Sequence, residues 1–315
     1  MMHLRATCPA ADVEQVLGCL RGATGVTGLV HLPGVVLDPP GDLVEADLAR
    51  EAVDGVVEDL QRCGLLRGDG ALVLLDVDTA TGRPVDRAED DAPGEGVDAV
   101  VWSQLVERAE SDGSLSAAFV VFLTVATLIA AVGLITDSQV LIVGAMVLGP
   151  EFTALASLAV AVVTRSARPA RDALKALAVG FPVAIALTAV AVALLDAGGL
   201  IPQAYVEGQR PLTSFVWSPD AFSVVVALLA GIAGTVSLTS DKASALVGVF
   251  ISVTTVPAAA EIAGAAVTGQ PDRAASSALQ LVLNIGCILL AAVVTLGVQR
   301  AAWKRMDRRR RAVAR

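Results

Sequence analysis

The chain has 315 residues, of which 55% are hydrophobic and 17% charged, with a mean hydropathy of +0.68 and a net charge of −9. This composition excludes disordered, collagen-like and disulfide-scaffold proteins. The charge is unevenly divided, because residues 1–113 hold 8 Lys/Arg against 22 Asp/Glu, whereas residues 114–315 hold 15 against 10. The acidic first part offers no basic face, so no nucleic-acid partner is expected.

Residues 1–80 predict a small cytoplasmic α+β domain. Strand patterns occupy residues 2–7, 26–32, 43–48 and 71–77, and helical periodicity occupies residues 10–20 and 50–63. The second strand is expected to end at Pro33-Gly34. The order βαββαβ is typical of a ferredoxin-like sandwich. Such a domain either binds a regulatory ligand or supports assembly, and the sequence leaves both alternatives open.

Residues 81–113 are predicted to lead from this domain into the membrane. Residues 79–96 are rich in Pro, Gly, Asp and Glu and are typical of a linker. Residues 98–110 space apolar side chains at helical intervals, which predicts an amphipathic helix beside the membrane.

Cys8, Cys19 and Cys63 lie in the acidic part without a CxxC pair, and we expect them to be core thiols of a protein in a reducing compartment. The only histidines are His3 and His31. With so few ligand side chains, neither a metal site nor a cofactor is expected.

Six long apolar runs predict six transmembrane helices, because a soluble bundle would show a polar stripe on each helix and these runs do not. They occupy residues 115–136, 138–164, 176–195, 221–240, 243–268 and 274–299. Basic residues gather after the second run and in the tail 300–315, whereas the opposite connections hold only Arg210 and Arg273. This asymmetry predicts a multi-pass protein of the cell membrane with both termini cytoplasmic. Tyr205, Phe215 and Trp217 suit the outer membrane interface.

The first three runs resemble the last three at an offset of 104 residues. Each set holds a turn with an Asp, Thr136-Asp137 or Ser240-Asp241, followed by a run that a proline interrupts. Because each set has three spans, the second would enter the membrane from the opposite side, as in the inverted repeats of transporters. The alternative is six spans with coincidental prolines.

The two interrupted runs hold the candidate site. Gly149 and Pro150 break the first of them, directly before Glu151. The broken helix offers a positive helix end that could hold a carboxylate or an anionic substrate. In the second run, Thr254 and Thr255 precede Pro257.

Glu151 and Glu261 are the only acidic residues well inside the runs, and such residues usually face a cavity or a partner. The leading interpretation is that Glu151 binds a cation or proton, or titrates during exchange. The alternative for both carboxylates is a place near the interface, or a pairing with Lys175 or Arg165. Asn284, in the sixth run, either bridges helices or coordinates substrate.

These motifs resemble a bacterial and archaeal membrane family known as domain of unknown function number 389. The resemblance rests on ATLIAAVG at 126–133, Asp137-Ser138, IVGAMVLGP at 142–150 and SALVGVFISVTTVP at 244–257, followed by Asn284. It is predicted to cover essentially the whole chain. Glu151 and Thr153-Ala154 depart from the family pattern, which places Glu151 in a subgroup.

The leading functional hypothesis is a transporter or ion-conducting protein for a small ion or solute, with a midplane site between the broken helices. The alternative is a membrane-anchored ligand sensor or scaffold. Small residues along the runs permit close helix approach and favour a compact bundle or a homo-oligomer in the lipid bilayer. An enzyme is not expected, because the sequence has no G-x-S-x-G motif, no H-E-x-x-H motif and no intramembrane His.

Overall fold

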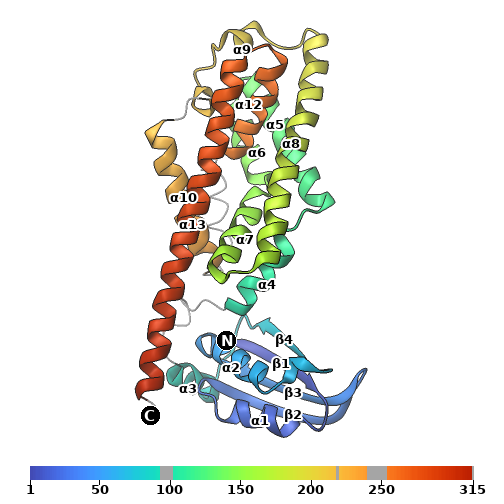
Figure 1. The fold of residues 1–315 in the computed structure, drawn as a ribbon, viewed down its shortest axis with the longest axis vertical. Coiled ribbons are helices and arrows are strands. Elements are labelled where there is room, and N and C mark those ends of the chain that lie inside the picture. The colour runs from blue at the N-terminus through green and yellow to red at the C-terminus, as the bar shows by residue number, and fades with distance from the viewer. Residues whose placement is uncertain (93–101, 218–219, 240–253, 314–315) are drawn as a thin grey trace. The chain divides into compact units, whose positions relative to one another are not determined.

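The computed structural model describes residues 1–92, 102–217, 220–239 and 254–313 (Figure 1). The chain divides into two compact units, Met1–Leu105 and Val106–Arg315. Each unit has its own hydrophobic core.

The first unit is an antiparallel sheet with helices on one face. Its elements are β1 (Met2–Cys8), α1 (Val13–Arg21), β2 (Val26–Leu37), β3 (Pro40–Leu48), η1 (Arg50–Ala52), α2 (Val53–Arg62), η2 (Leu65–Arg67), β4 (Ala71–Asp76) and α3 (Arg83–Asp91). The strand order is β2-β3-β1-β4, and every neighbouring pair is antiparallel. Alternate residues of β1 and β3 pack with the apolar faces of α1 and α2. The element order is the one that the sequence predicts.

Two boundaries of this unit differ from the prediction. Strand β2 continues through Pro33 and Gly34 to Leu37, because it lies at the sheet edge, where a proline removes no required ladder hydrogen bond. Helix α3 lies inside the predicted linker. It has a proline in its first turn, and it buries Ala88 despite its acidic composition.

The prediction that the first three cysteines are core thiols is wrong for two of them. Cys19, at the end of α1, and Cys63, at the end of α2, form a disulfide, and both are half-buried. Cys8 is buried in β1 without a disulfide, and burial together with the charge of Asp42 raises the pKa of its thiol.

The second unit is helical. Helix α4 (Trp102–Asp112) begins in the last residues of the first unit and agrees with the predicted helix beside the membrane, of which residues 98–101 lie outside the described part. The remaining elements are α5 (Ala117–Ile135), α6 (Gln139–Leu148), α7 (Glu151–Thr164), α8 (Ala167–Ala197), α9 (Gln203–Glu207), η4 (Ser214–Val216), α10 (Ala221–Thr239), α12 (Thr255–Val267) and α13 (Pro271–Val313).

Four of these helices, α5, α8, α10 and α13, are long and apolar enough to cross a membrane, and the bent pair α6–α7 raises the number to five. They indicate an integral membrane protein. Of the predicted fifth span, only α12 with 13 residues is described, and residues 243–253 lie outside the described part together with Ser240 and Asp241. Helix α8 begins at Ala167, earlier than predicted, so Arg168, Arg171 and Lys175 belong to a helix and not to a connection.

The helix boundaries repeat at a separation of 104 residues. Helices α5 and α10 both begin and end 104 residues apart, as do the first residues of α7 and α12 and those of α8 and α13. The ends of α7 and α12 also match: Thr164 and Thr268 donate to carbonyls four residues earlier, and Arg165 and Gly269 follow with φ of 61° and 74°.

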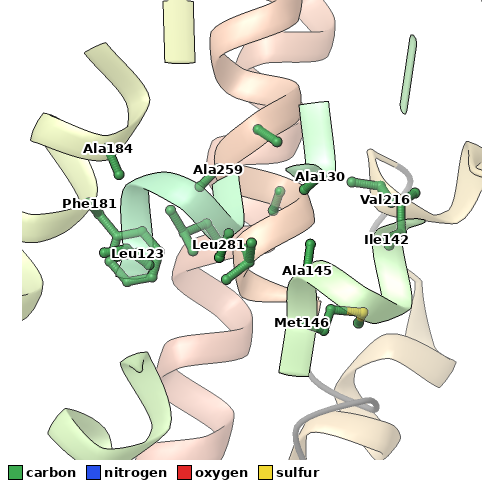
Figure 2. Packing of buried hydrophobic residues seen from close by; sticks show 14 of the residues in the cluster. Leu123, Ala130, Ile142, Ala145, Met146, Phe181, Ala184, Val216, Ala259 and Leu281 are labelled. Carbon is green, nitrogen blue, oxygen red and sulfur yellow. The ribbon is translucent and has the colours of Figure 1, made fainter. Parts of the chain in front are cut away.

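The helices that start 104 residues apart also have corresponding packing partners. Helix α8 packs against α5, α7 and α12, whereas α13 packs against α10, α12 and α7. The interior between them is filled by small, aliphatic and aromatic side chains, including Leu123, Phe181, Ala259 and Leu281 (Figure 2). The core therefore lies where the two sets of three helices meet.

Candidate functional site

Helices α7 and α12 begin next to each other inside the helical second unit, Val106–Arg315, which we call the membrane unit. Helix α6 ends at Leu148, the chain bends by 45° at Gly149-Pro150, and α7 begins at Glu151. Helix α12 begins at Thr255, whose hydroxyl donates a 2.6 Å hydrogen bond to Oε1 of Glu151. The first residues of the two helices are therefore in direct contact. The predicted break at Gly149-Pro150 is confirmed.

The two helices run from this contact to opposite ends of the unit. Helix α7 is followed closely by the start of α8, and α12 is followed closely by the start of α13. The 31 residues of α8 rise about 46 Å, so its two ends lie far apart. Arg273, in the first turn of α13, donates to the carbonyls of Tyr205 and Val206, which lie shortly after the end of α8. The starts of α8 and α13 are therefore at opposite ends (Figure 1).

Glu151 is 3% exposed and forms no ion pair within the described residues. Its Oε2 atom is buried and has no hydrogen-bond partner among them. A Cβ added at Gly149 would collide with Oε2 of Glu151 and would lie 2.8 Å from Cγ2 of Val256. The carboxylate therefore folds back over the helix break. A glycine is needed there for the carboxylate to reach Thr255.

Asn284 on α13 completes what we term the Glu151 cluster, which consists of Glu151, Thr254, Thr255 and Asn284. Nδ2 of Asn284 donates to Oγ1 of Thr254 at 2.6 Å, so Asn284 bridges α13 to the start of α12. Because this bond uses the Thr254 oxygen as an acceptor, the Thr254 hydroxyl proton is left to donate.

Two further buried polar residues lie on the same face of α13 as Asn284. Gln280 donates to Oδ1 of Asn284 at 3.4 Å, and its own Oε1 has no partner among the described residues, nor has the Ser277 hydroxyl. The positions 104 residues earlier on α8 are Ala173, Ala176 and Gly180. The three buried polar residues are therefore a property of α13, and Ser277 and Gln280 were not among the predicted site residues.

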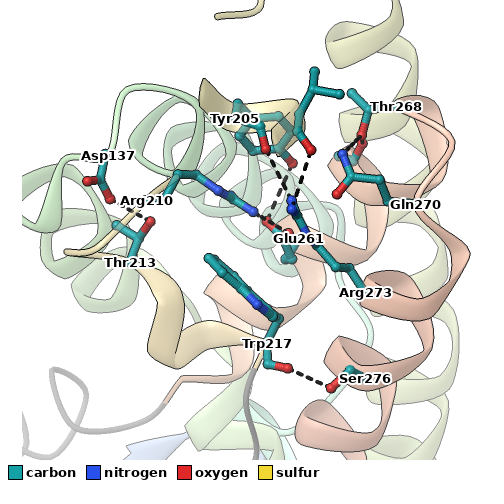
Figure 3. Close-up of polar contacts among 12 residues, drawn as sticks. Asp137, Tyr205, Arg210, Thr213, Trp217, Glu261, Thr268, Gln270, Arg273 and Ser276 are labelled. Atoms are coloured by element: carbon teal, nitrogen blue, oxygen red, sulfur yellow. Dashed lines mark hydrogen bonds and ion pairs between the residues drawn. The ribbon is translucent and has the colours of Figure 1, made fainter. Parts of the chain in front are cut away.

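Glu261 lies in a different cluster, on α12, about 9 Å along the helix from Thr255. Its two oxygens accept from Arg210, with Nη2 at 2.7 Å from Oε1 and Nη1 at 2.9 Å from Oε2 (Figure 3). Both side chains are buried. The Arg210 guanidinium lies between two rings, 4.1 Å from the centroid of Tyr205 and 4.2 Å from that of Trp217.

Several bonds hold this Arg210 cluster, which consists of Tyr205, Arg210, Trp217, Glu261 and Arg273, in place (Figure 3). Ser276 donates to the Trp217 carbonyl at 2.6 Å, and Thr213 donates to Asp137 at 2.8 Å. Burial and the Glu261 carboxylate raise the pKa of the Tyr205 hydroxyl. The connection between α8 and α10 is therefore tied to α12, to α13 and to the turn after α5.

The structure adds to the interpretation of this connection. Tyr205 is 1% exposed, and both Tyr205 and Trp217 stack on the Arg210 guanidinium, whereas their place at the outer membrane interface stays a prediction. The partner of Glu261 is Arg210 and not Lys175, which instead contacts Asp172 at 3.5 Å. The one signal for Arg210 was that it is the only basic residue between α8 and α10.

The predicted site residues thus fall into two groups. Gly149, Pro150, Glu151, Thr254, Thr255 and Asn284 come together, with Pro257 buried in the first turn of α12, whereas Glu261 belongs to the Arg210 cluster. The described residues contain no group of three or more His, Cys, Asp and Glu side chains that could hold a metal ion.

Comparison with known proteins agrees with the predicted resemblance. Residues 146–290 match the family described as Domain of unknown function (DUF389). An uncharacterized protein of Methanocaldococcus jannaschii is 23% identical over 236 residues, which cover 74% of this chain and 70% of that protein. No solved structure matches the chain. The motif at 126–133 precedes the matched range, so the chain resembles the family over 146–290, a range that holds both the Glu151 cluster and Glu261.

Proposed function

We propose that this chain is an integral membrane transporter or ion-conducting protein whose site lies where α7 and α12 begin. One observation carries the proposal: the N-termini of two half-helices meet on a buried carboxylate that has no ion-pair partner among the described residues. Discontinuous helices that meet near the middle of a membrane commonly form the ion or substrate sites of transporters. No catalytic role is assigned to any residue.

The proposal includes an inverted repeat of two three-helix units. The 104-residue spacing of the helix starts supports it. The packing supports it as well, because α8 follows α7 and also packs against α12, whereas α13 follows α12 and also packs against α7. The opposite directions of α7 and α12 are those that a two-fold axis in the membrane plane would produce. Such an axis would pass through the bond between Glu151 and Thr255, since these residues occupy equivalent positions.

The bilayer is the expected surrounding of the helical unit. Phe122, Leu194, Phe222 and Val282 are each more than half exposed on helices that otherwise pack on one another. We propose a cell-membrane location with both termini cytoplasmic, from the excess of basic residues after α7 and in the C-terminal part of α13. A homo-oligomer is part of the proposal, and the ferredoxin-like first unit would regulate or assemble it.

The decisive experiment compares Glu151→Gln with the unaltered protein in proteoliposomes, with fluxes of chloride, sodium, potassium and protons recorded separately. We expect the unaltered protein to raise one of these fluxes above that of protein-free vesicles, and Glu151→Gln to change that flux at least tenfold. Asp196→Asn, which removes an exposed carboxylate from α8, is the matched control. Fluxes equal to those of empty vesicles would reject transport of these ions and favour the sensor or scaffold.

A further inference from the structure

We propose that the Glu151 cluster is a binding site for a small monovalent anion, and that the Glu151 carboxylate occupies it as a tethered anion. This inference rests on the proposed function and names its substrate class. It assigns Thr254 and Thr255 as hydrogen-bond donors to the bound anion.

The electrostatic balance at the contact favours a negative charge. Each helix N-terminus carries about half an elementary positive charge, and the partial charges of α7 and α12 both act at the point where Glu151 meets Thr255. The C-terminus of α6, which ends at Leu148, opposes them with about half an elementary negative charge, so the net potential from the three helix ends at the carboxylate remains positive. A cation bound here would face two positive helix ends, so the geometry does not favour the cation that the sequence analysis assigned to Glu151.

The side chains around the carboxylate also suit an anion. The Thr255 hydroxyl already donates to Oε1 of Glu151. The bond from Asn284 orients Thr254 as an acceptor, so the Thr254 hydroxyl proton remains available as a second donor. Halides and carboxylates are bound in proteins by such hydroxyls and by helix N-termini.

Glu151 is held loosely enough to leave this place. It has one hydrogen bond to another side chain, to Thr255, and its Oε2 atom is buried without a partner among the described residues. The absence of a side chain at Gly149 leaves the space that the folded-back carboxylate uses. Glu261, in contrast, is fixed by Arg210 through both of its oxygens.

Binding of bromide to the purified full-length protein tests this inference. Glu151→Gln keeps the size of the side chain but removes its charge, so the helix ends lose their counter-charge. We expect this variant to bind bromide at least tenfold more tightly than the unaltered protein in isothermal titration calorimetry. Adding Thr255→Val to Glu151→Gln removes the donating hydroxyl and should weaken bromide binding at least tenfold.

Two outcomes would overturn the inference: bromide binding by Glu151→Gln no tighter than by the unaltered protein, or sodium binding by the unaltered protein that Glu151→Gln abolishes. Glu151→Ala serves as a second variant, because it opens space as well as removing the charge. If either outcome occurs while Glu151→Gln still changes flux in proteoliposomes, the anion assignment fails and the proposed transport function stands. If the unaltered protein raises a flux that does not depend on Glu151, the proposed transport site fails, and if it raises no flux, the transport function itself fails.

Discussion

Glu151 and Glu261 are the two carboxylates that the described part of the membrane unit buries, and their surroundings differ. Glu261 pairs with Arg210 at 2.7 Å, and the rings of Tyr205 and Trp217 cover the guanidinium. Glu151 has a hydroxyl partner and the ends of two helices, with no ion pair to a described residue. Both arrangements lower the cost of a charge in an apolar interior.

We interpret Glu261 as a structural charge and, under the proposed anion site, Glu151 as an exchangeable one. A bidentate ion pair between stacked rings has a defined geometry, and it ties the connection after α8 to α12. Helix ends offer a diffuse positive potential that another anion of similar size can satisfy equally well. We therefore expect substitutions at Glu261 to act on folding and substitutions at Glu151 to act on binding and flux.

The largest loss of stability should come from removing one partner of the ion pair between Arg210 and Glu261. Glu261→Leu leaves the Arg210 charge buried without its carboxylate, and we expect a loss of about 3–5 kcal/mol of stability. Replacing both partners, as Arg210→Met with Glu261→Leu, removes the charge as well and should restore most of that loss. Thermal unfolding of the detergent-solubilised variants measures both. A double variant no more stable than Glu261→Leu would show that the pair is not the cause.

The next largest loss of stability should come from substitutions at the glycines near the two carboxylates, Gly264 for Glu261 and Gly149 for Glu151. A Cβ at Gly264 would collide with the Tyr205 hydroxyl and lie 3.1 Å from its ring, so Gly264→Ala must displace a stiff aromatic side chain. We expect a cost of about 1–3 kcal/mol in thermal unfolding. Gly149→Ala collides chiefly with the flexible end of Glu151, so it should cost less stability while changing flux more. Equal stability losses at the two glycines would contradict the comparison.

A smaller effect on stability is expected for Glu151→Gln. The substitution removes the attraction between a carboxylate and two helix ends, and one such attraction is worth about 0.3–1 kcal/mol at exposed sites and up to about 2 kcal/mol when partly buried. The loss should therefore be well below that of Glu261→Leu in the same unfolding measurement. A loss as large as that of Glu261→Leu would mean that Glu151 is also a structural charge.

The smallest effect lies outside the membrane unit, at a third carboxylate. His31 donates to Asp42 at 2.8 Å and the Gly34 amide donates at 2.9 Å, and these bonds lower the pKa of Asp42. Because the folded value is below the unfolded one, the stabilisation is present above about pH 4 and is lost as the pH falls through the folded pKa. Asp42→Asn should flatten the pH dependence of unfolding between pH 5 and pH 2, and an unchanged slope would contradict this assignment.

Much of the fold could be predicted from the sequence because it depends on local patterns. Alternation and helical periodicity predict the βαββαβ order, and uninterrupted apolar runs predict α5, α10 and the membrane part of α13. The break before Glu151 follows from Gly149 and Pro150, which are neighbours in sequence. Helix α3 was missed because its acidic composition outweighed the weak signals of a proline in the first turn and one buried alanine.

The partners of the two carboxylates could not be predicted in the same way. Thr255 lies 104 residues from Glu151, and Arg210 lies 51 residues from Glu261 in a connection that looks like a surface loop. The Cys19–Cys63 disulfide joins the ends of two helices 44 residues apart, so it also depends on how α1 and α2 pack.

The sequence by itself determined that this protein has a small α+β unit, a set of apolar helices, and two carboxylates inside those helices. These features follow from composition and from the short-range periodicity of side chains. Only the tertiary structure decided which carboxylate forms an ion pair and which lies at the ends of two helices. That outcome depends on where α12 begins and on how the connection after α8 folds back, because an ion pair and a helix end both act only within a few ångströms of the charge.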